Sequence, residues 1–267
     1  MAGKAITITS GKGGVGKTTA TANLGAAMAA SGKKVVCIDA DIGLRNLDMV
    51  MGLENRIVYD LVDVIEGRCR LRQAMIRDRK LPNLYLIPAA QTRDKSAISP
   101  SDMIRLCDEL RQEVDYIFID SPAGIERGFR NAIAPANSVV IVTNPEVSAV
   151  RDADRIIGLV EAEEKGPARL IINRINPRMV QQGDMLTADY ILELLAIDLL
   201  GLIPEDENVI VSSNRGTPIA LDAKSKAGEA FRNIAKRLDG QDVPLMDLAA
   251  DDGFLGRISR FIRPGGN

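Results

Sequence analysis

The sequence contains no histidine and only three cysteines in 267 residues. Without histidine the chain cannot form a Ser-His-Asp triad, use a histidine general base or bind a metal through imidazole. The cysteines, Cys37, Cys69 and Cys107, are few, odd in number and widely separated. This pattern argues against a disulfide framework or an iron–sulfur cluster. We therefore expect buried, reduced thiols, as in a cytosolic protein.

Long apolar runs and an excess of charge of one sign are also missing. No stretch approaches the roughly 18 apolar residues of a membrane span, and the first residues lack the apolar core of a signal peptide. The 34 basic and 36 acidic residues give a net charge of −2, which argues against a broad basic face for nucleic acid. With 46% apolar and 26% charged residues, the composition predicts a soluble globular protein.

Short apolar segments alternate with longer segments of helical periodicity along most of the chain. The expected strands lack polar alternation, which is typical of parallel strands buried on both faces. They cover residues 5–9, 35–39, 84–88, 116–120, 138–143, 169–173 and 199–203. The expected helices cover residues 17–30, 58–65, 100–112, 149–163, 186–195 and 224–238. This alternation predicts an α/β fold with a doubly wound, mostly parallel sheet flanked by helices.

A glycine-rich loop follows the first expected strand and matches the pattern G-x-x-x-x-G-K-[ST]. Its glycines let backbone N–H groups surround phosphate oxygens, and the following helix points its N-terminus at the same anion. Lys17 is expected to reach the β and γ phosphates, and the Thr18 hydroxyl to ligate Mg²⁺. The predicted nucleotide-binding residues here are Gly11, Lys12, Gly13, Gly14, Val15, Gly16, Lys17, Thr18 and Thr19.

Lys12 is not required by the general pattern. A lysine five residues before Lys17 is hard to fold back onto the same γ phosphate. It is either a solvated side chain or a group that donates charge to a phosphate across a dimer interface.

Acidic residues end two other expected strands. Asp120 follows one apolar segment, and Asp39 and Asp41 lie at the end of another. Because open α/β sheets bind ligands at the carboxyl ends of their strands, these acids and the loop should share one rim. We expect Asp41 to orient the attacking water, and Asp39 and Asp120 to support the metal. In the alternative, Asp39 or Asp41 only caps the segment that follows.

The segments GKGGVGKTT, IDADIGLRNLD and DSPAGIE resemble the deviant Walker A ATPases, a family that includes plasmid-partition ATPases and the nitrogenase iron protein. Further segments are similar to the branch that positions the bacterial division septum: GLRNLDMVMGLENRIVYDLVDVI, QTRDK, TNPEVSAVRDADRI, GDML and IPEDENV. The resemblance implies a P-loop NTPase fold and Mg²⁺-dependent hydrolysis of ATP.

The resemblance also implies individual roles. Lys12 matches the lysine that reaches the partner subunit's ATP in a dimer, and Asp41 matches the acid that positions water. Asn173 and Pro204 match positions that contact adenine in related ATPases. A helix near Ser148 matches the surface that receives a division inhibitor and a second regulator. Its matching residues are Ser148, Arg151, Asp152 and Asp154, which would otherwise be interpreted as a solvated helix face.

The chain ends in a basic amphipathic segment. The predicted organisation is an ATPase domain at 1–238, an acidic linker at 239–252, a helix at 253–263 and a tail at 264–267. Apolar residues of the helix recur on one stripe beside Arg257, Arg260 and Arg263, as in membrane-surface helices. The alternative is a terminal helix packed on its own domain. The predicted membrane-contacting residues are Phe254, Leu255, Arg257, Ile258, Phe261 and Ile262.

These features, with the resemblance, predict a Mg²⁺-dependent ATPase that dimerises with ATP and binds anionic lipid reversibly. It would be cytoplasmic and peripheral on the cytoplasmic face of the inner membrane, where it recruits a division inhibitor. No nucleic-acid partner is expected. The alternative is a DNA-partition ATPase, which needs a basic DNA-facing patch and no lipid helix. A metabolic ligase or an electron-transfer ATPase is a third reading, and the latter would need clustered cysteines.

Overall fold

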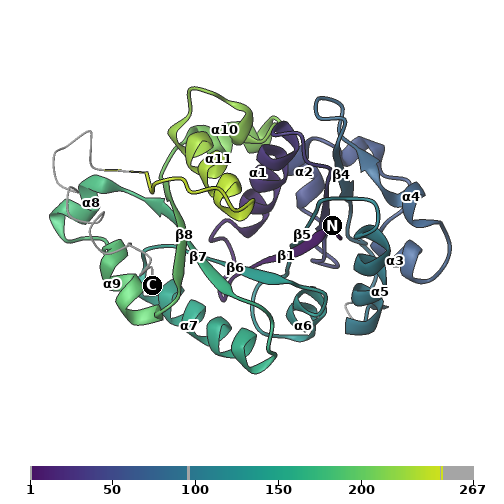
Figure 1. Cartoon of the computed structure of the whole chain (residues 1–267), viewed down its shortest axis with the longest axis horizontal. Coiled ribbons are helices and arrows are strands. Elements are labelled where there is room, and N and C mark those ends of the chain that lie inside the picture. Colours follow the sequence, from purple (N-terminus) through teal and green to yellow (C-terminus); the bar gives the residue numbers. More distant parts are fainter. Residues whose placement is uncertain (1, 95–96, 247, 249–267) are drawn as a thin grey trace.

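The computed structural model describes residues 2–94, 97–246 and 248, and these build one eight-stranded sheet (Figure 1). The strands are β1 (Lys4–Thr9), β2 (Val35–Asp39), β3 (Ile76–Arg77), β4 (Leu84–Ile87), β5 (Tyr116–Asp120), β6 (Ser138–Thr143), β7 (Ala168–Ile175) and β8 (Asp198–Pro204). Their order is β3-β4-β2-β5-β1-β6-β7-β8, and each pair is parallel except β3–β4. The predicted doubly wound sheet is therefore confirmed.

Helices cover both faces of the sheet. They are α1 (Lys17–Ala30), α2 (Leu47–Met51), η1 (Glu54–Arg56), α3 (Leu61–Ile65), α4 (Leu71–Ala74), α5 (Pro100–Leu110), α6 (Arg127–Ile133), α7 (Val147–Ala162), α8 (Pro177–Gln182), α9 (Ala188–Leu195), α10 (Asn208–Asn214), η3 (Ile219–Leu221) and α11 (Lys226–Leu238). Helices α1 and α11 lie together on one face, and α5, α6 and α7 lie on the other (Figure 1).

The core follows the alternation of side chains along each strand. Ile6 and Phe118 face α1 and α11, whereas Ala5 and Ile117 face the layer that contains α5. Every residue of β2 and β5 is buried. Apolar residues therefore occupy both faces of these strands, which explains their lack of polar alternation.

Most differences from the predicted elements have local causes. The helices expected at 58–65, 186–195 and 224–238 begin two or three residues later, because Asp60, Thr187 and Ser225 are N-caps whose side chains accept backbone N–H bonds. Strand β3 and the short helices α2, α4, α6, α8 and α10 were not predicted. They contain two to seven residues, too few to show a periodic pattern.

The described chain ends beyond α11. That helix stops at Leu238, at the predicted domain boundary, and Leu248 packs against the hydrophobic cluster formed by α7, α9 and their strands. The predicted membrane helix at 253–263 lies outside the described residues. Within the described residues, no helix is both long enough and apolar enough to cross a bilayer.

Candidate nucleotide-binding site

The glycine-rich loop connects β1 to α1 at the carboxyl rim of the sheet. Gly14 and Gly16 have φ angles of +77° and +105°, which only glycine adopts without strain. Gly16 is the N-cap of α1, so the first N–H groups of that helix face the loop. Lys17 begins the helix and is buried. Burial lowers the pKa of its ammonium group, while the carboxylates of Asp120 and Asp41 act in the opposite direction.

Asn173 supports this loop from β7. Its Nδ2 donates a hydrogen bond of 2.8 Å to the carbonyl oxygen of Val15, and a Cβ atom on Gly16 would lie 2.4 Å from the same Nδ2. Pro204 ends β8 opposite Ile175, so the two predicted adenine-contacting residues lie at the ends of neighbouring strands. The structure thus assigns Asn173 a supporting contact. Its contact with a base stays a prediction, as does that of Pro204.

Thr18 and Asp120, both predicted to serve the metal, are brought together. Thr21 Oγ1 donates a hydrogen bond to Asp120 Oδ1 at 3.4 Å, and the Thr18 side chain acts to lower the pKa of the same carboxyl group. Burial, together with the nearby carboxylate of Asp39, raises the pKa of Asp120 to about 8. A cation bound beside Asp120 would favour its ionised form and so offset the cost of burying the carboxylate.

Both carboxylate oxygens of Asp39 accept hydrogen bonds from backbone N–H groups. Its Oδ1 accepts from the N–H of Asp41 at 3.0 Å, and its Oδ2 accepts from Asn46 and Leu47 at 3.1 Å each. Burial raises the pKa of Asp39 to about 6, although these three bonds favour the ionised form. The observed contacts are those of a cap for the segment 41–47, which is the alternative considered for this residue. A metal role for Asp39 stays a prediction.

Asp41 opens a strained segment between β2 and α2. Its charge lies near both Lys17 and Asp120. Further along, Arg45 has a φ angle of +45°, and its Nε lies 2.9 Å from Oδ2 of the buried Asp48. Left-handed backbone in a non-glycine residue persists only where neighbouring contacts hold it. The structure thus places Asp41 beside the loop, at the start of a segment that its contacts hold in one conformation.

Lys12 points at the start of α7. Its Nζ donates to Glu146 Oε2 at 3.2 Å and to Ser148 Oγ at 3.1 Å, and its side chain is 43% exposed. In the structure it is therefore paired, although it remains accessible. Glu146 was not predicted as a site residue. It follows β6, whose carboxyl end shares the rim with the loop, and that topology is the signal that would have found it.

The helix expected to receive partners packs directly on the glycine-rich loop. A Cβ atom on Gly11 would lie 2.3 Å from the backbone oxygen of Asp152, one turn into α7. Ser148 contacts Lys12, whereas Arg151 and Asp154 are exposed. The four predicted partner-binding residues thus lie on one helix, and two of them contact the loop.

Comparison with known proteins identifies the family. Residues 6–219 match the family model of the CobQ/CobB/MinD/ParA nucleotide-binding domain. The chain is 56% identical to the septum site-determining protein MinD of Synechocystis over 257 residues, which are 96% of this chain and 97% of that protein. This chain belongs to the MinD family. Like other members, it is a P-loop ATPase, and the family acts in division-site placement.

Two solved MinD structures extend the similarity to the fold. MinD in the MinC:MinD complex of Aquifex aeolicus superposes with a TM-score of 0.86 at 48% identity, covering 91% of this chain and 99% of that one. MinD of Pyrococcus horikoshii, solved with Mg-ADP, has a TM-score of 0.80 at 30% identity, covering 88% and 96% of the two chains. The fold that carries the loop and the strand-end acids is therefore shared with solved MinD proteins.

The residues present suit a nucleotide-bound magnesium ion. Among the described residues, no three His, Cys, Asp or Glu side chains are arranged to hold a metal by themselves. A MinD-type site would instead hold Mg²⁺ through the Thr18 hydroxyl and nucleotide phosphates, with the buried Asp120 beside Thr18. The contact between Thr18 and Asp120 fits that arrangement.

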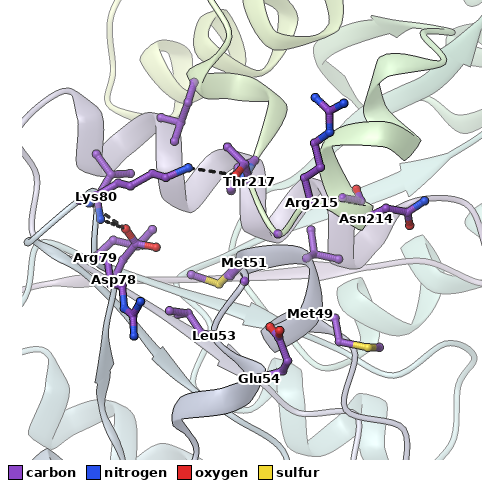
Figure 2. A pocket seen from close by; sticks show the side chains of 18 of the residues that line it. Met49, Met51, Leu53, Glu54, Asp78, Arg79, Lys80, Asn214, Arg215 and Thr217 are labelled. Carbon is purple, nitrogen blue, oxygen red and sulfur yellow. Dashed lines mark hydrogen bonds between the residues drawn. The ribbon is translucent and has the colours of Figure 1, made fainter.

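A separate groove of about 840 Å³ lies beside α2 (Figure 2). It is bounded by residues 46–54, the turn 78–81 and residues 213–221. Lys80 Nζ donates to Thr217 Oγ1 at 3.1 Å and so links two of these walls. Asn46, which belongs to the segment capped by Asp39, lines the groove. None of the predicted site residues lines it.

Proposed function

We propose that this chain is a Mg²⁺-dependent ATPase that dimerises with ATP and binds the cytoplasmic face of the cell membrane reversibly. There it recruits a MinC-like division inhibitor, and a MinE-like regulator controls its hydrolysis. The observation that carries the proposal is the placement of Lys12. The Lys12 side chain donates hydrogen bonds to Glu146 and Ser148 rather than to its own loop. It remains accessible to a second subunit.

Apolar residues on the same rim support dimerisation. Leu44, in the segment after β2, is 63% exposed, and Ile125, in the segment after β5, is 51% exposed. Both segments follow parallel strands whose carboxyl ends lie on the same rim as the phosphate loop. Large apolar side chains at the centre of a contact surface, surrounded by polar groups, are typical of protein interfaces. A second copy facing this rim would cover them and bring its Lys12 to the nucleotide.

Different residues of the site bind the phosphates and position the attacking water. Backbone N–H groups from Gly11 to Thr18 and the ammonium group of Lys17 bind the phosphates and favour the charge that develops on them. Asp41 orients the water that attacks the γ phosphate, and the β–γ phosphoanhydride bond breaks. Mg²⁺, when bound, neutralises phosphate charge. Because the chain has no histidine, we assign the positioning of water to Asp41, the acid at the start of the segment 41–47.

Partner binding is assigned to the exposed side of α7. MinD of Aquifex aeolicus has been solved as a MinC:MinD complex, and this chain is 48% identical to it. Ser148, Arg151, Asp152 and Asp154 lie on α7, where Asp152 and Ser148 also contact the phosphate loop. Nucleotide-dependent changes in the loop would therefore reach the partner surface directly.

Membrane attachment is assigned to residues 253–263. One short amphipathic helix with three arginines gives weak, reversible binding, because ordering it offsets much of the gain from burying its apolar stripe. Two helices tethered in one dimer bind far more tightly, since the second binds at a high effective concentration. Dimerisation with ATP would thus place the chain on the membrane, and hydrolysis would release it.

Sedimentation with anionic vesicles tests the proposal. The parent should pellet with Mg-ATP but not with ADP, and Phe261→Glu should abolish pelleting. Lys12→Ala, which removes the lysine offered to the second subunit, should lose ATP-dependent pelleting while still binding nucleotide. Tight vesicle binding by Lys12→Ala would contradict the dimer switch. Absence of pelleting together with salt-sensitive DNA retention would instead favour the DNA-partition alternative.

A further inference from the structure

An apolar groove runs between α7 and α9 on the face of the sheet opposite α11. Its volume is about 350 Å³. Three of its side chains are largely exposed, Val147 at 59%, Tyr190 at 49% and Leu194 at 50%. We name it the α7–α9 groove and define it by its apolar residues Val147, Val150, Leu186, Tyr190, Leu194 and Leu195. Adjacent exposed apolar side chains of this size indicate a surface that something covers.

The described chain ends on the hydrophobic cluster that also contributes residues to this groove. Leu248 packs against the hydrophobic cluster that contains Val150, Leu186 and Leu195, three of the groove residues. Only residues 249–253 separate Leu248 from Phe254, the first apolar residue of the terminal stripe. Extended chain advances at most about 3.3–3.6 Å per residue, so this connection reaches roughly 20 Å. The groove is within reach of the segment that follows.

The terminal segment and the groove match in charge and in length. Helices α7 and α9 together carry five acidic and two basic residues, whereas residues 253–263 carry three arginines and no acid. Asp154 lies on the groove itself, beside Arg151. An amphipathic helix of ten residues is about 15 Å long, comparable with the eight-residue α9. An apolar stripe flanked by arginines therefore fits an apolar groove between two helices that together carry an excess of acidic residues.

We propose that residues 253–263 dock into the α7–α9 groove of their own chain. The apolar stripe then lies against Tyr190 and Leu194, and the arginines lie near the acidic residues of the two helices. The stripe cannot occupy lipid and the groove at the same time. Because Arg151 and Asp154 line the groove, the docked segment also covers part of the surface assigned to partners. The covering of the partner surface rests on the proposed function, whereas the docking itself does not.

Disulfide trapping tests the docking without lipid or nucleotide. The full chain carries Cys69→Ser, to remove the one half-exposed thiol, together with Leu194→Cys and Ile258→Cys. Under mild oxidation this pair should form an intramolecular disulfide quickly. The matched pair is Ile210→Cys with Ile258→Cys, because Ile210 is 66% exposed on α10, which packs on the other side of the sheet. Equal rates for the two pairs would overturn the proposal, and a dimeric product alone would assign the groove to a second copy.

Vesicle binding gives an independent readout. Leu194→Glu should release the terminal segment and raise pelleting in ADP several-fold, whereas the matched Ile210→Glu should behave as the parent. Unchanged pelleting of Leu194→Glu, in a protein whose parent pellets with ATP, would contradict the docking. If no variant pellets with any nucleotide, the membrane part of the proposed function fails. The disulfide experiment then still decides the docking.

Discussion

Asp39 and Asp120 occupy the same rung of the parallel pair β2–β5, and both are almost completely buried. The two carboxylates nevertheless have different partners. Asp39 accepts hydrogen bonds from three backbone N–H groups of the segment 41–47, whereas Asp120 accepts one from the hydroxyl of Thr21 and lies near Thr18. Asp39 thus holds the backbone of the segment 41–47, and Asp120 faces the first turn of α1.

Substituting the two acids should separate these roles. Asp39→Asn places an NH₂ group against backbone donors, so we expect it to lower the free energy of unfolding by about 1–3 kcal/mol in the absence of nucleotide. Amide exchange in residues 41–47 should become faster. Asp120→Asn keeps an acceptor for the Thr21 hydroxyl and avoids the cost of ionising a buried carboxyl group, so the stability without nucleotide should be equal or higher. Urea unfolding and hydrogen exchange measure both effects. An Asp39→Asn variant with parental stability and exchange would rule out the capping role.

The pair formed by Lys12 and Glu146 should oppose dimerisation. Lys12 must leave Glu146 to reach the nucleotide of a second subunit. Glu146→Gln removes this competing charge, and an exposed ion pair contributes about 0.2–1 kcal/mol. Because a symmetric dimer breaks two such pairs, one in each subunit, we expect a dimer dissociation constant up to about thirtyfold lower in ATP. Sedimentation equilibrium measures it, with the exposed Glu161→Gln on the same helix as the control. Weaker dimerisation of Glu146→Gln would show that Glu146 has another role.

Gly11 should be required for the contact between the phosphate loop and α7. In Gly11→Ala the new Cβ would lie 2.3 Å from the backbone oxygen of Asp152, which neither backbone can accommodate without moving. We expect a loss of about 1–3 kcal/mol in the free energy of unfolding. Gly13→Ala is the matched control in the same loop, because its Cβ would have no neighbour closer than Ala123 at 4.0 Å. Both are measured without nucleotide, and equal stabilities would contradict the close contact.

The pH dependence of stability should include a contribution from Asp239. A hydrogen bond from Lys33 lowers the pKa of Asp239, and the hydroxyl of Tyr116 donates to the same carboxylate at 2.8 Å. The folded protein therefore binds this proton less tightly than the unfolded chain. The stabilisation is present above the unfolded pKa of about 4 and disappears as the pH falls through the lower folded value.

We therefore expect Asp239→Asn to lower the Tm at pH 7 by about 2 °C, because pairs of this exposure contribute at most about 1 kcal/mol. The difference from the parent should become smaller as the pH falls below about 4. Asp242→Asn, an exposed acid in the same segment, is the control. A difference of the same size at pH 7 and at pH 3 would mean that the carboxylate charge is not the cause.

Local patterns were enough to place the main elements of the site. The run from Gly11 to Thr18 follows a strand and precedes a helix, and Asp39 and Asp120 each end an apolar segment. In a parallel α/β sheet the carboxyl ends of the strands share one rim, so these residues converge whatever the details of packing. Order along the chain therefore determined the fold class, the phosphate loop and the acids beside it.

Tertiary packing decided which groups these residues contact. Lys12 and Glu146 are separated by 134 positions, Asn173 and Val15 by 158, and Tyr116 and Asp239 by 123. No local pattern links such pairs, because each contact depends on how a helix or strand packs over the rim. The same applies to Asp39, whose capping of the segment 41–47 requires that segment to fold back over β2. The sequence thus determined where the chemical groups lie along the rim, and packing determined their partners there.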